Sequence, residues 1–187
     1  APWPKAMLHF SRALGFTNTG NSSKAQKELD ILINLRDRLN EAKNSYETGQ
    51  VTIQIESIKG WIEYSKGNTE KAIEYMKLAS KLESETSKAA VTPGEIIPAE
   101  ELLADLYMLT GRHKEALKSY ELNLKGRPFR FNGLYGAAKA AQNLDNNELA
   151  AYYFEKLIKV SEDVNSSRPE LLEAKDFLAN NTNSKNV

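Results

Sequence analysis

The side chains that most often carry out chemistry are scarce in this sequence, and their spacing does not bring them together. The 187 residues include 2 histidines, His9 and His113, and no cysteine. These counts exclude a three-histidine metal site, a thiolate zinc site and a cysteine nucleophile. His9 falls in a predicted helix and His113 in a polar turn, where the simplest interpretation is a solvated side chain.

The remaining polar residues also lack a catalytic signature. The chain contains no glycine-rich dinucleotide fingerprint, no phosphate-binding loop, no Gly-x-Ser-x-Gly and no His-Glu-x-x-His. Neighbouring carboxylates such as Glu100 and Glu101 diverge by about 100° on a helix, so we do not expect them to share a proton. The sequence therefore predicts a protein that is not an enzyme and uses no cofactor or metal.

The charge balance limits the partners. Lys and Arg number 25 and Asp and Glu number 25, so the formal net charge is zero. A nucleic acid or an anionic membrane would be held by a strong positive excess, and we expect neither as a partner. No run approaches 18 apolar residues, which predicts no membrane-inserted helix.

The ends of the chain leave the compartment open. The sequence begins at Ala1 without an intact signal peptide, which fits removal of Met, cleavage of a leader or trimming. A cytoplasmic protein and an exported, periplasmic protein are both consistent with this beginning. Residues 181–187 have almost no apolar side chains, and we expect a disordered tail there.

The secondary-structure elements that must position any site are predicted to be almost entirely helices. Leucines recur every three or four residues, at Leu29, Leu32, Leu35 and Leu39 and again from Leu102 to Leu109. The first series predicts one long helix over 23–46. The six prolines stand at segment edges, and strand signals are almost absent, so the predicted fold class is all-α.

Four copies of one pattern follow each other along the chain. Each has a polar turn, a small residue that lets two helices approach, and a large apolar residue four positions later. The small residues are Ala25, Ala72, Ala116 and Ala150. The preceding helices end at Gly20, Gly67 and Gly111, where a left-handed backbone is easiest for glycine. Asn21, Asn68 and Asn146 are predicted to cap the helices that follow.

This pattern resembles the tetratricopeptide repeat family. In the third copy it is carried by Ala104, Tyr107, Gly111, Ala116, Tyr120 and Pro128, and in the fourth by Ala138, Ala150, Phe154 and Leu157. The stretch 127–141 is similar to the last repeat of a group of uncharacterised bacterial proteins of this family. The resemblance implies a right-handed α-solenoid of about four helical hairpins.

The domain prediction is a single solenoid over 1–180. Its repeats cover about 6–48, 50–84, 97–129 and 130–163. A capping box at Ser167 to Glu170 opens a further helix over 168–179. A solenoid needs such a C-terminal cap to cover the apolar flank of its last repeat.

Two places depart from the family pattern. In the second copy Lys59 and Glu63 stand where apolar residues are usual, which predicts either a rotated helix or a Lys59–Glu63 pair. Between copies two and three lies an insertion with a predicted tight turn at Pro93-Gly94. We expect its apolar residues, Val91, Ile96 and Ile97, to be buried.

The resemblance implies a groove lined by the first helix of each hairpin. Family geometry would place Ser57 and the following residues on it: Phe10, Leu14, Trp61, Tyr64, Glu101, Asp105, Met108, Tyr135, Lys139 and Gln142. Aromatic residues and Met beside scattered charges are typical of peptide-binding surfaces. Trp61 fits either the groove or the core. Some relatives grip a C-terminal carboxylate with Lys, Asn and Arg, and the first copy has Phe10 and Leu14 instead.

The predicted function is a non-catalytic scaffold that binds a protein or peptide of unknown identity in this groove. The alternative is a structural or self-associating module, in which the chain itself or a second copy fills the groove. Exposed groove residues favour the first reading, and a closed groove or a large symmetric contact favours the second.

Overall fold

The fold was analysed in a computed structural model, which describes residues 2–86, 95–162 and 166–184. Within these ranges there are nine helices and no strand. They are α1 (Pro2–Asn18), α2 (Ser22–Glu41), α3 (Ser45–Ser65), α4 (Thr69–Glu85), α5 (Ala99–Leu109), α6 (His113–Gly126), α7 (Phe131–Gln142), α8 (Asn147–Lys159) and α9 (Pro169–Ser184). The predicted all-α class is confirmed.

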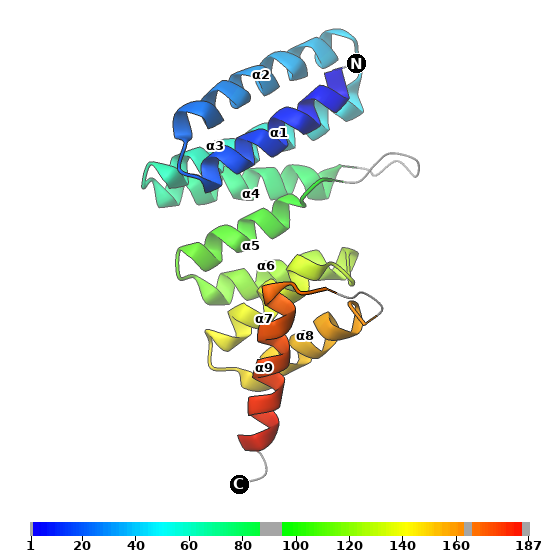
Figure 1. Cartoon of the computed structure of the whole chain (residues 1–187). Helices are drawn as coiled ribbons and strands as arrows, with labels where there is room; N and C mark the ends of the chain where they lie inside the picture. The colour runs from blue at the N-terminus through cyan, green and yellow to red at the C-terminus, as the bar shows by residue number, and fades with distance from the viewer. Residues whose placement is uncertain (1, 87–94, 163–165, 185–187) are drawn as a thin grey trace. The chain divides into compact units, whose positions relative to one another are not determined.

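The helices form two compact units, Ala1–Leu103 and Ala104–Val187, and the division falls within α5. In the first unit α1 packs on α2 and α3, and α3 packs on α4. In the second unit α6 packs on α7, α7 on α8 and α8 on α9. Figure 1 shows the short turns that join the two helices of each hairpin.

The turns between paired helices follow the sequence signals. Gly20, Gly67 and Gly111 have φ angles of 73°, 84° and 72°, the left-handed conformation that glycine adopts most easily. The Asn21 side chain accepts a hydrogen bond from the Lys24 amide at 3.1 Å, which confirms the predicted cap of α2. Asn146 caps α8 in the same way, through the Leu149 amide at 3.1 Å.

The predicted capping hydrogen bond to the Asn68 side chain does not form. Asn68 occupies the N-cap position of α4, but its side chain makes no capping bond. Its Nδ2 instead donates to Glu63 Oε2 at 2.8 Å. A buried carboxylate nearby is the stronger acceptor, because charge-assisted hydrogen bonds exceed neutral ones in strength.

The small residues of the repeat lie in helix contacts. All four repeat alanines are fully buried: Ala25, Ala72, Ala116 and Ala150. Gly60 has the same role in α3, where an added Cβ would lie 2.8 Å from Met76 Cγ. This spacing confirms that the repeat register positions close contacts between helices.

Two local predictions need correction. The long helix predicted over 23–46 ends at Glu41, because Lys43 takes a positive φ of 57° and Asn44 then caps α3 through the Glu47 amide. The Lys59–Glu63 pair does not form. Lys59 Nζ lies 2.7 Å from Glu56 Oε1, one helical turn earlier on the same helix.

The insertion is only partly as predicted. Val91 and the Pro93-Gly94 turn lie outside the described residues. Ile96 is 39% exposed, contrary to the prediction, and Ile97 is half-buried. Pro98 directly precedes α5, and its carbonyl accepts a hydrogen bond from the Leu102 amide at the start of that helix.

The last helix, α9, packs against the α7/α8 hairpin, as Figure 1 shows. Phe177 of α9 lies 5.0 Å from the Phe154 ring, measured between ring centroids. The Arg168 guanidinium lies 3.9 Å from the centre of the Phe131 ring. α9 continues to Ser184 rather than ending at 179, because each residue added to a docked helix gains a backbone hydrogen bond.

Candidate functional site

The most distinctive surface of the first unit is one face of α3. Four of its residues are spaced four, three and four positions apart, which places them on one side of a helix: Gln50, Gln54, Ser57 and Trp61. All four are buried, with 8%, 9%, 1% and 6% of their surface exposed. Polar side chains and an indole therefore line one buried face of α3.

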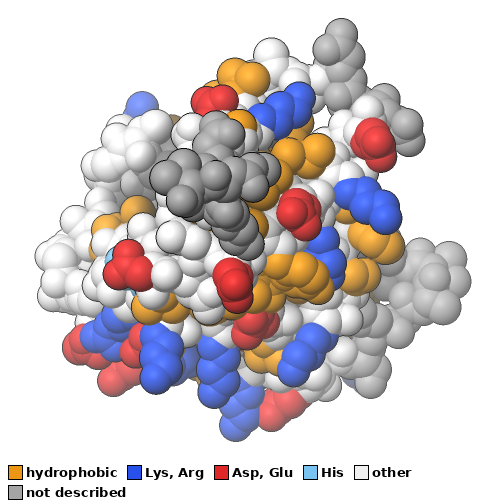
Figure 2. All heavy atoms as spheres, turned by 90° about the horizontal axis from the view of Figure 1, so that it is seen from below, with side chains coloured by type: hydrophobic (Ala, Val, Ile, Leu, Met, Phe, Trp, Pro, Cys, Tyr) orange, Lys and Arg blue, Asp and Glu red, His pale blue; other side chains and the backbone are white. Residues whose placement is uncertain are grey.

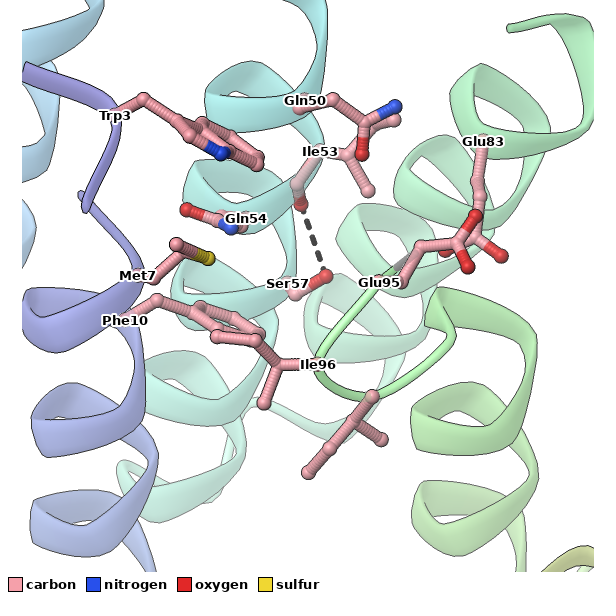
Figure 3. A pocket seen from close by; sticks show the side chains of 11 residues that line it. Trp3, Met7, Phe10, Gln50, Ile53, Gln54, Ser57, Glu83, Glu95 and Ile96 are labelled. Atoms are coloured by element: carbon pink, nitrogen blue, oxygen red, sulfur yellow. Dashed lines mark hydrogen bonds between the residues drawn. The ribbon is translucent and has the colours of Figure 1, made fainter. Parts of the chain in front are cut away.

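A cavity opens on this face, and Figure 3 shows its lining. The cavity itself has a volume of about 20 Å³, and the open space at its mouth brings this to about 350 Å³. Its lining residues come from α1, α3, α4 and the chain before α5: Trp3, Met7, Phe10, Gln50, Ile53, Gln54, Ser57, Glu83, Glu95, Ile96 and Ile97. Apolar walls with a few polar groups are typical of binding pockets.

Two polar atoms on this face of α3 are unsatisfied. Among the described residues, Gln54 Oε1 and Trp61 Nε1 are the buried side-chain atoms without a hydrogen-bond partner in the structure. In Figure 3 the Gln54 side chain lies between Trp3 and Met7 of α1. By contrast, the Ser57 hydroxyl is satisfied by the Ile53 carbonyl at 2.9 Å. An unpaired buried acceptor is costly, so a ligand or an ordered water that donates to it gains free energy.

The opposite side of the cavity carries carboxylates. Glu83 is buried, and its Oε2 accepts a hydrogen bond from the Ala99 amide at 2.7 Å. This bond satisfies a free N–H at the start of α5 and ties that helix to α4. Glu95 completes the wall, beside Ile96 at the end of the insertion.

The predicted groove residues of the first unit lie in different environments. Phe10 lines the cavity, as does Ser57, so family geometry brings these two together. Leu14 and Glu101 are buried at 7% and 1% exposure and do not line it. Trp61 is buried and stands edge-on to the half-buried Tyr64, with ring centroids 5.9 Å apart.

In the second unit, the chain itself contacts predicted groove residues. Tyr135 donates to Glu173 Oε2 and Lys139 donates to Glu173 Oε1, both at 2.5 Å. Lys139 also donates to Gln142 at 3.0 Å. A carboxylate of α9 thus contacts two predicted groove residues of α7, and the third, Gln142, is bonded to Lys139.

The pKa values in this cluster follow from its contacts. Burial, and then the hydrogen bond to the Glu173 carboxylate, raise the pKa of Tyr135 far above its usual range. Burial raises the pKa of Glu173, but the hydrogen bonds from Lys139 and Tyr135 outweigh it and lower the pKa overall. Glu173 is therefore held as a carboxylate at neutral pH.

The other two predicted groove residues of this unit are only partly accessible. Asp105 accepts a hydrogen bond from the Tyr120 hydroxyl of α6 at 2.5 Å, and it is half-buried. Met108 is also half-buried. Asp105 therefore serves the contact between α5 and α6.

Sequence reasoning predicted only Phe10 and Ser57 of the lining as site residues, and Trp3, Met7, Gln50 and Gln54 are among those that it missed. The signal for the two glutamines was present. Gln50, Gln54 and Ser57 form a polar line at helical spacing beside the apolar residues of α3, and a polar line on a buried helix points to a site. Trp3 precedes the first repeat and Met7 lies at its very start, where the family pattern gives little register.

Other kinds of site were searched for in the same residue ranges. No group of three or more His, Cys, Asp or Glu side chains there could hold a metal ion. None of the helices in these ranges is long and apolar enough to cross a membrane.

Comparison with known proteins agrees with the sequence pattern. The family model for the tetratricopeptide repeat matches residues 58–86 and 101–125. No curated protein matches the chain by sequence.

Several solved structures share the fold. A tetratricopeptide repeat protein from Parabacteroides merdae is 17% identical with a TM-score of 0.57, and covers 94% of this chain. The chain spans 59% of that protein's length. A protein of nearly identical TPR-like repeats from Podosopora anserina is 15% identical, with a TM-score of 0.61 over 96% of this chain and 86% of its own. The MamA protein is 14% identical, with a TM-score of 0.52 over 88% of this chain and 98% of its own.

Identities this low establish the fold alone. The family model and the arrangement of the helices agree independently, and both copies that the model matches contain the alanine and glycine positions of the repeat. The chain therefore contains two stretches that match the tetratricopeptide repeat model, and it has an all-α helical-repeat fold similar to that of these structures.

Proposed function

We propose that this protein is a non-catalytic scaffold and that the α3 face of its first unit binds an extended segment of a partner protein. The observation that carries the proposal is the pair of unsatisfied atoms on that face, the acceptor Gln54 Oε1 and the donor Trp61 Nε1. A peptide main chain offers both complementary groups, an N–H and a C=O, at every residue.

The spacing of the two side chains fits such a ligand. Gln54 and Trp61 are seven residues apart on α3, which is about 10.5 Å along a helix at about 1.5 Å per residue. Three residues of extended chain span about 10 Å. The N–H of the first and the C=O of the third of these residues point to the same side of an extended chain, so one can donate to Gln54 while the other accepts from Trp61.

The rest of the cavity supplies the apolar part of the contact. Phe10, Ile53 and Met7 offer an apolar wall to one side chain of the peptide. Ile96 stands at 39% exposure on the chain before α5, where it can move aside as the peptide enters. Apolar and aromatic contacts of this kind supply most of the free energy in peptide recognition.

The second unit supports the alternative, a groove filled by the chain itself. Glu173 of α9 pairs with Tyr135 and Lys139, which family geometry would assign to a ligand. We therefore assign partner binding to the first unit, and a capping role to α9 in the second.

A phage-displayed library of random peptides tests the proposal. The chain has 2 tryptophans, Trp3 and Trp61. Trp3 lines the cavity and Trp61 is on the same face of α3 as Gln54, so a bound peptide should change their fluorescence emission. We expect Gln54→Leu, which keeps the side-chain size and removes the acceptor, to weaken selected peptides by about tenfold.

The matched control is Gln26→Leu, at an exposed glutamine of α2 that contacts Asp30. This variant should bind like the wild type. Peptides that bind wild type and Gln54→Leu equally, with no change in tryptophan emission, would contradict the proposed site.

A further inference from the structure

A second hollow lies between α6 and α8, which are the second helices of their hairpins, whereas the predicted groove uses the first helices. It encloses about 650 Å³ with its mouth. Its lining residues are Glu121, Leu124, Lys125, Pro128, Leu134, Tyr152, Tyr153 and Lys156. All of them belong to the second unit.

The floor and one wall of this hollow are apolar. Leu134 is buried beneath it, and Leu124 is half-buried. The Tyr152 ring is 47% exposed, although it packs edge-on against Tyr153 with centroids 5.1 Å apart. An exposed ring beside one buried and one half-buried leucine is a surface on which an apolar side chain can lose contact with water.

The loop from α6 to α7 extends this surface. Pro128 lines the hollow, and the next residue, Phe129, is 77% exposed. Both come from the stretch 127–141 that the sequence pattern singled out. Phe129 thus adds exposed apolar surface next to a residue that lines the hollow.

The charges at the rim are unequal. Lys125 and Lys156 are exposed, and neither has an ion pair among the described residues; Lys156 Nζ lies 4.4 Å from the Tyr152 ring centre. The lining carboxylate is Glu121, which accepts a hydrogen bond from the Tyr153 hydroxyl at 3.0 Å. Two lysines therefore face the mouth while the one lining carboxylate is engaged with a tyrosine.

We infer that this hollow binds an acidic peptide segment, with an apolar or aromatic side chain over Leu124, Leu134 and Tyr152 and flanking carboxylates on Lys125 and Lys156. This follows from the charge complementarity of the rim and the apolar floor. Figure 2 shows one face of the molecule, on which side chains of both signs are interspersed around small hydrophobic patches without a broad field of one sign.

The test uses a synthetic fluorescein-labelled peptide, one phenylalanine flanked on each side by two acidic residues, titrated onto the full chain. We expect Lys125→Gln with Lys156→Gln to weaken binding by about tenfold, the effect of two surface charge contacts. The matched control is Lys118→Gln with Lys159→Gln, which removes the same charge from the same two helices outside the hollow. This control should bind like the wild type.

A second variant, Tyr152→Ala, tests the apolar part at an exposed position where folding should not suffer. It should also weaken the peptide, and circular dichroism should show the wild-type helix content. Four outcomes would overturn the inference: no binding of the acidic peptide, equal binding of a peptide with lysines in place of the acids, equal binding by both double variants, or full displacement by inorganic polyphosphate.

Discussion

Single residues decide how closely the helices of each unit approach. A Cβ added at Gly136 would lie 2.3 Å from Tyr120 Cζ, closer than atoms in contact can stand. The same addition at Gly15 would meet nothing within 4 Å. Gly136 is therefore required by the close approach of Tyr120, whereas Gly15 has room for a side chain and only lowers the helix propensity of α1.

We therefore expect Gly136→Ala to destabilise the protein by about 1–3 kcal/mol, because the Tyr120 ring must shift from α7 and strain its hydrogen bond to Asp105. Gly15→Ala should instead stabilise it by about 0.5–1 kcal/mol through helix propensity. Urea unfolding of both variants checks the pair. Equal effects would show that the Tyr120 contact does not set the distance between the helices.

Glu63 gives a prediction for pH. Hydrogen bonds from Lys66, Asn68 and Lys71 lower its pKa from an ordinary 4.5 to about 2. A carboxyl group with a lowered folded pKa stabilises the fold above its unfolded pKa and loses that contribution as pH falls through the folded value. The stabilisation should thus be present above pH 4.5 and disappear towards pH 2.

The check is thermal melting of wild type and Glu63→Gln from pH 7 to pH 2. The wild type should melt higher at neutral pH, and the difference should shrink across the window between the two pKa values. Glu47→Gln is the control, at a carboxylate in the first turn of α3. A difference between wild type and Glu63→Gln that stays constant with pH would contradict the assigned contacts.

At the scale of the helix, the repeat register rests on the buried alanines. We expect Ala116→Glu to melt the α6/α7 packing, because a carboxylate would enter a fully buried contact without a partner, at a cost of several kcal/mol. Lys118→Glu places the same residue two positions later, on the exposed side of α6. In circular dichroism melting, Ala116→Glu should have a much lower melting midpoint than Lys118→Glu. Similar midpoints for the two variants would refute the repeat register.

The sequence predicts those features of the fold that depend on residues close together in the chain. Turn glycines such as Gly67 and buried alanines such as Ala72 are required by chain geometry within one hairpin, so the sequence carries their signal directly. The partners of Glu63 and Glu173 were not predictable. Their contacts depend on side-chain packing, which the family pattern does not encode.

The candidate site was predicted in part for the same reason. Phe10 and Ser57 follow from the register of the repeat. Gln54 matters because no neighbour satisfies its carbonyl oxygen, and that depends on every side chain around it. The exposure of Ile96 likewise reflects the path of the chain before α5 rather than its own hydrophobicity.

For the molecule as a whole, equal numbers of acidic and basic residues imply no strong long-range field. The two proposed sites should then respond differently to salt. Uncharged peptides on the α3 face are held by apolar walls and two uncharged polar atoms, and they carry no charge to pair with Glu83 and Glu95 on the opposite wall, so their affinity should change less than about twofold between low and high salt. Acidic peptides at the α6/α8 hollow pair with two lysines, so their affinity should fall as salt screens those contacts.

This comparison is made by titrating both peptides at 0.02 M and 0.5 M salt. The electrostatic screening length is about 20 Å at the lower and about 4 Å at the higher concentration. Trp61→Phe should weaken only the α3 peptide, since it removes the indole N–H and keeps an aromatic ring. Tyr135→Phe should leave that peptide unaffected, because Tyr135 donates to Glu173 within the second unit. A steep salt dependence of the α3 peptide, with Trp61→Phe silent, would mean that charge rather than main-chain hydrogen bonding recognises the partner.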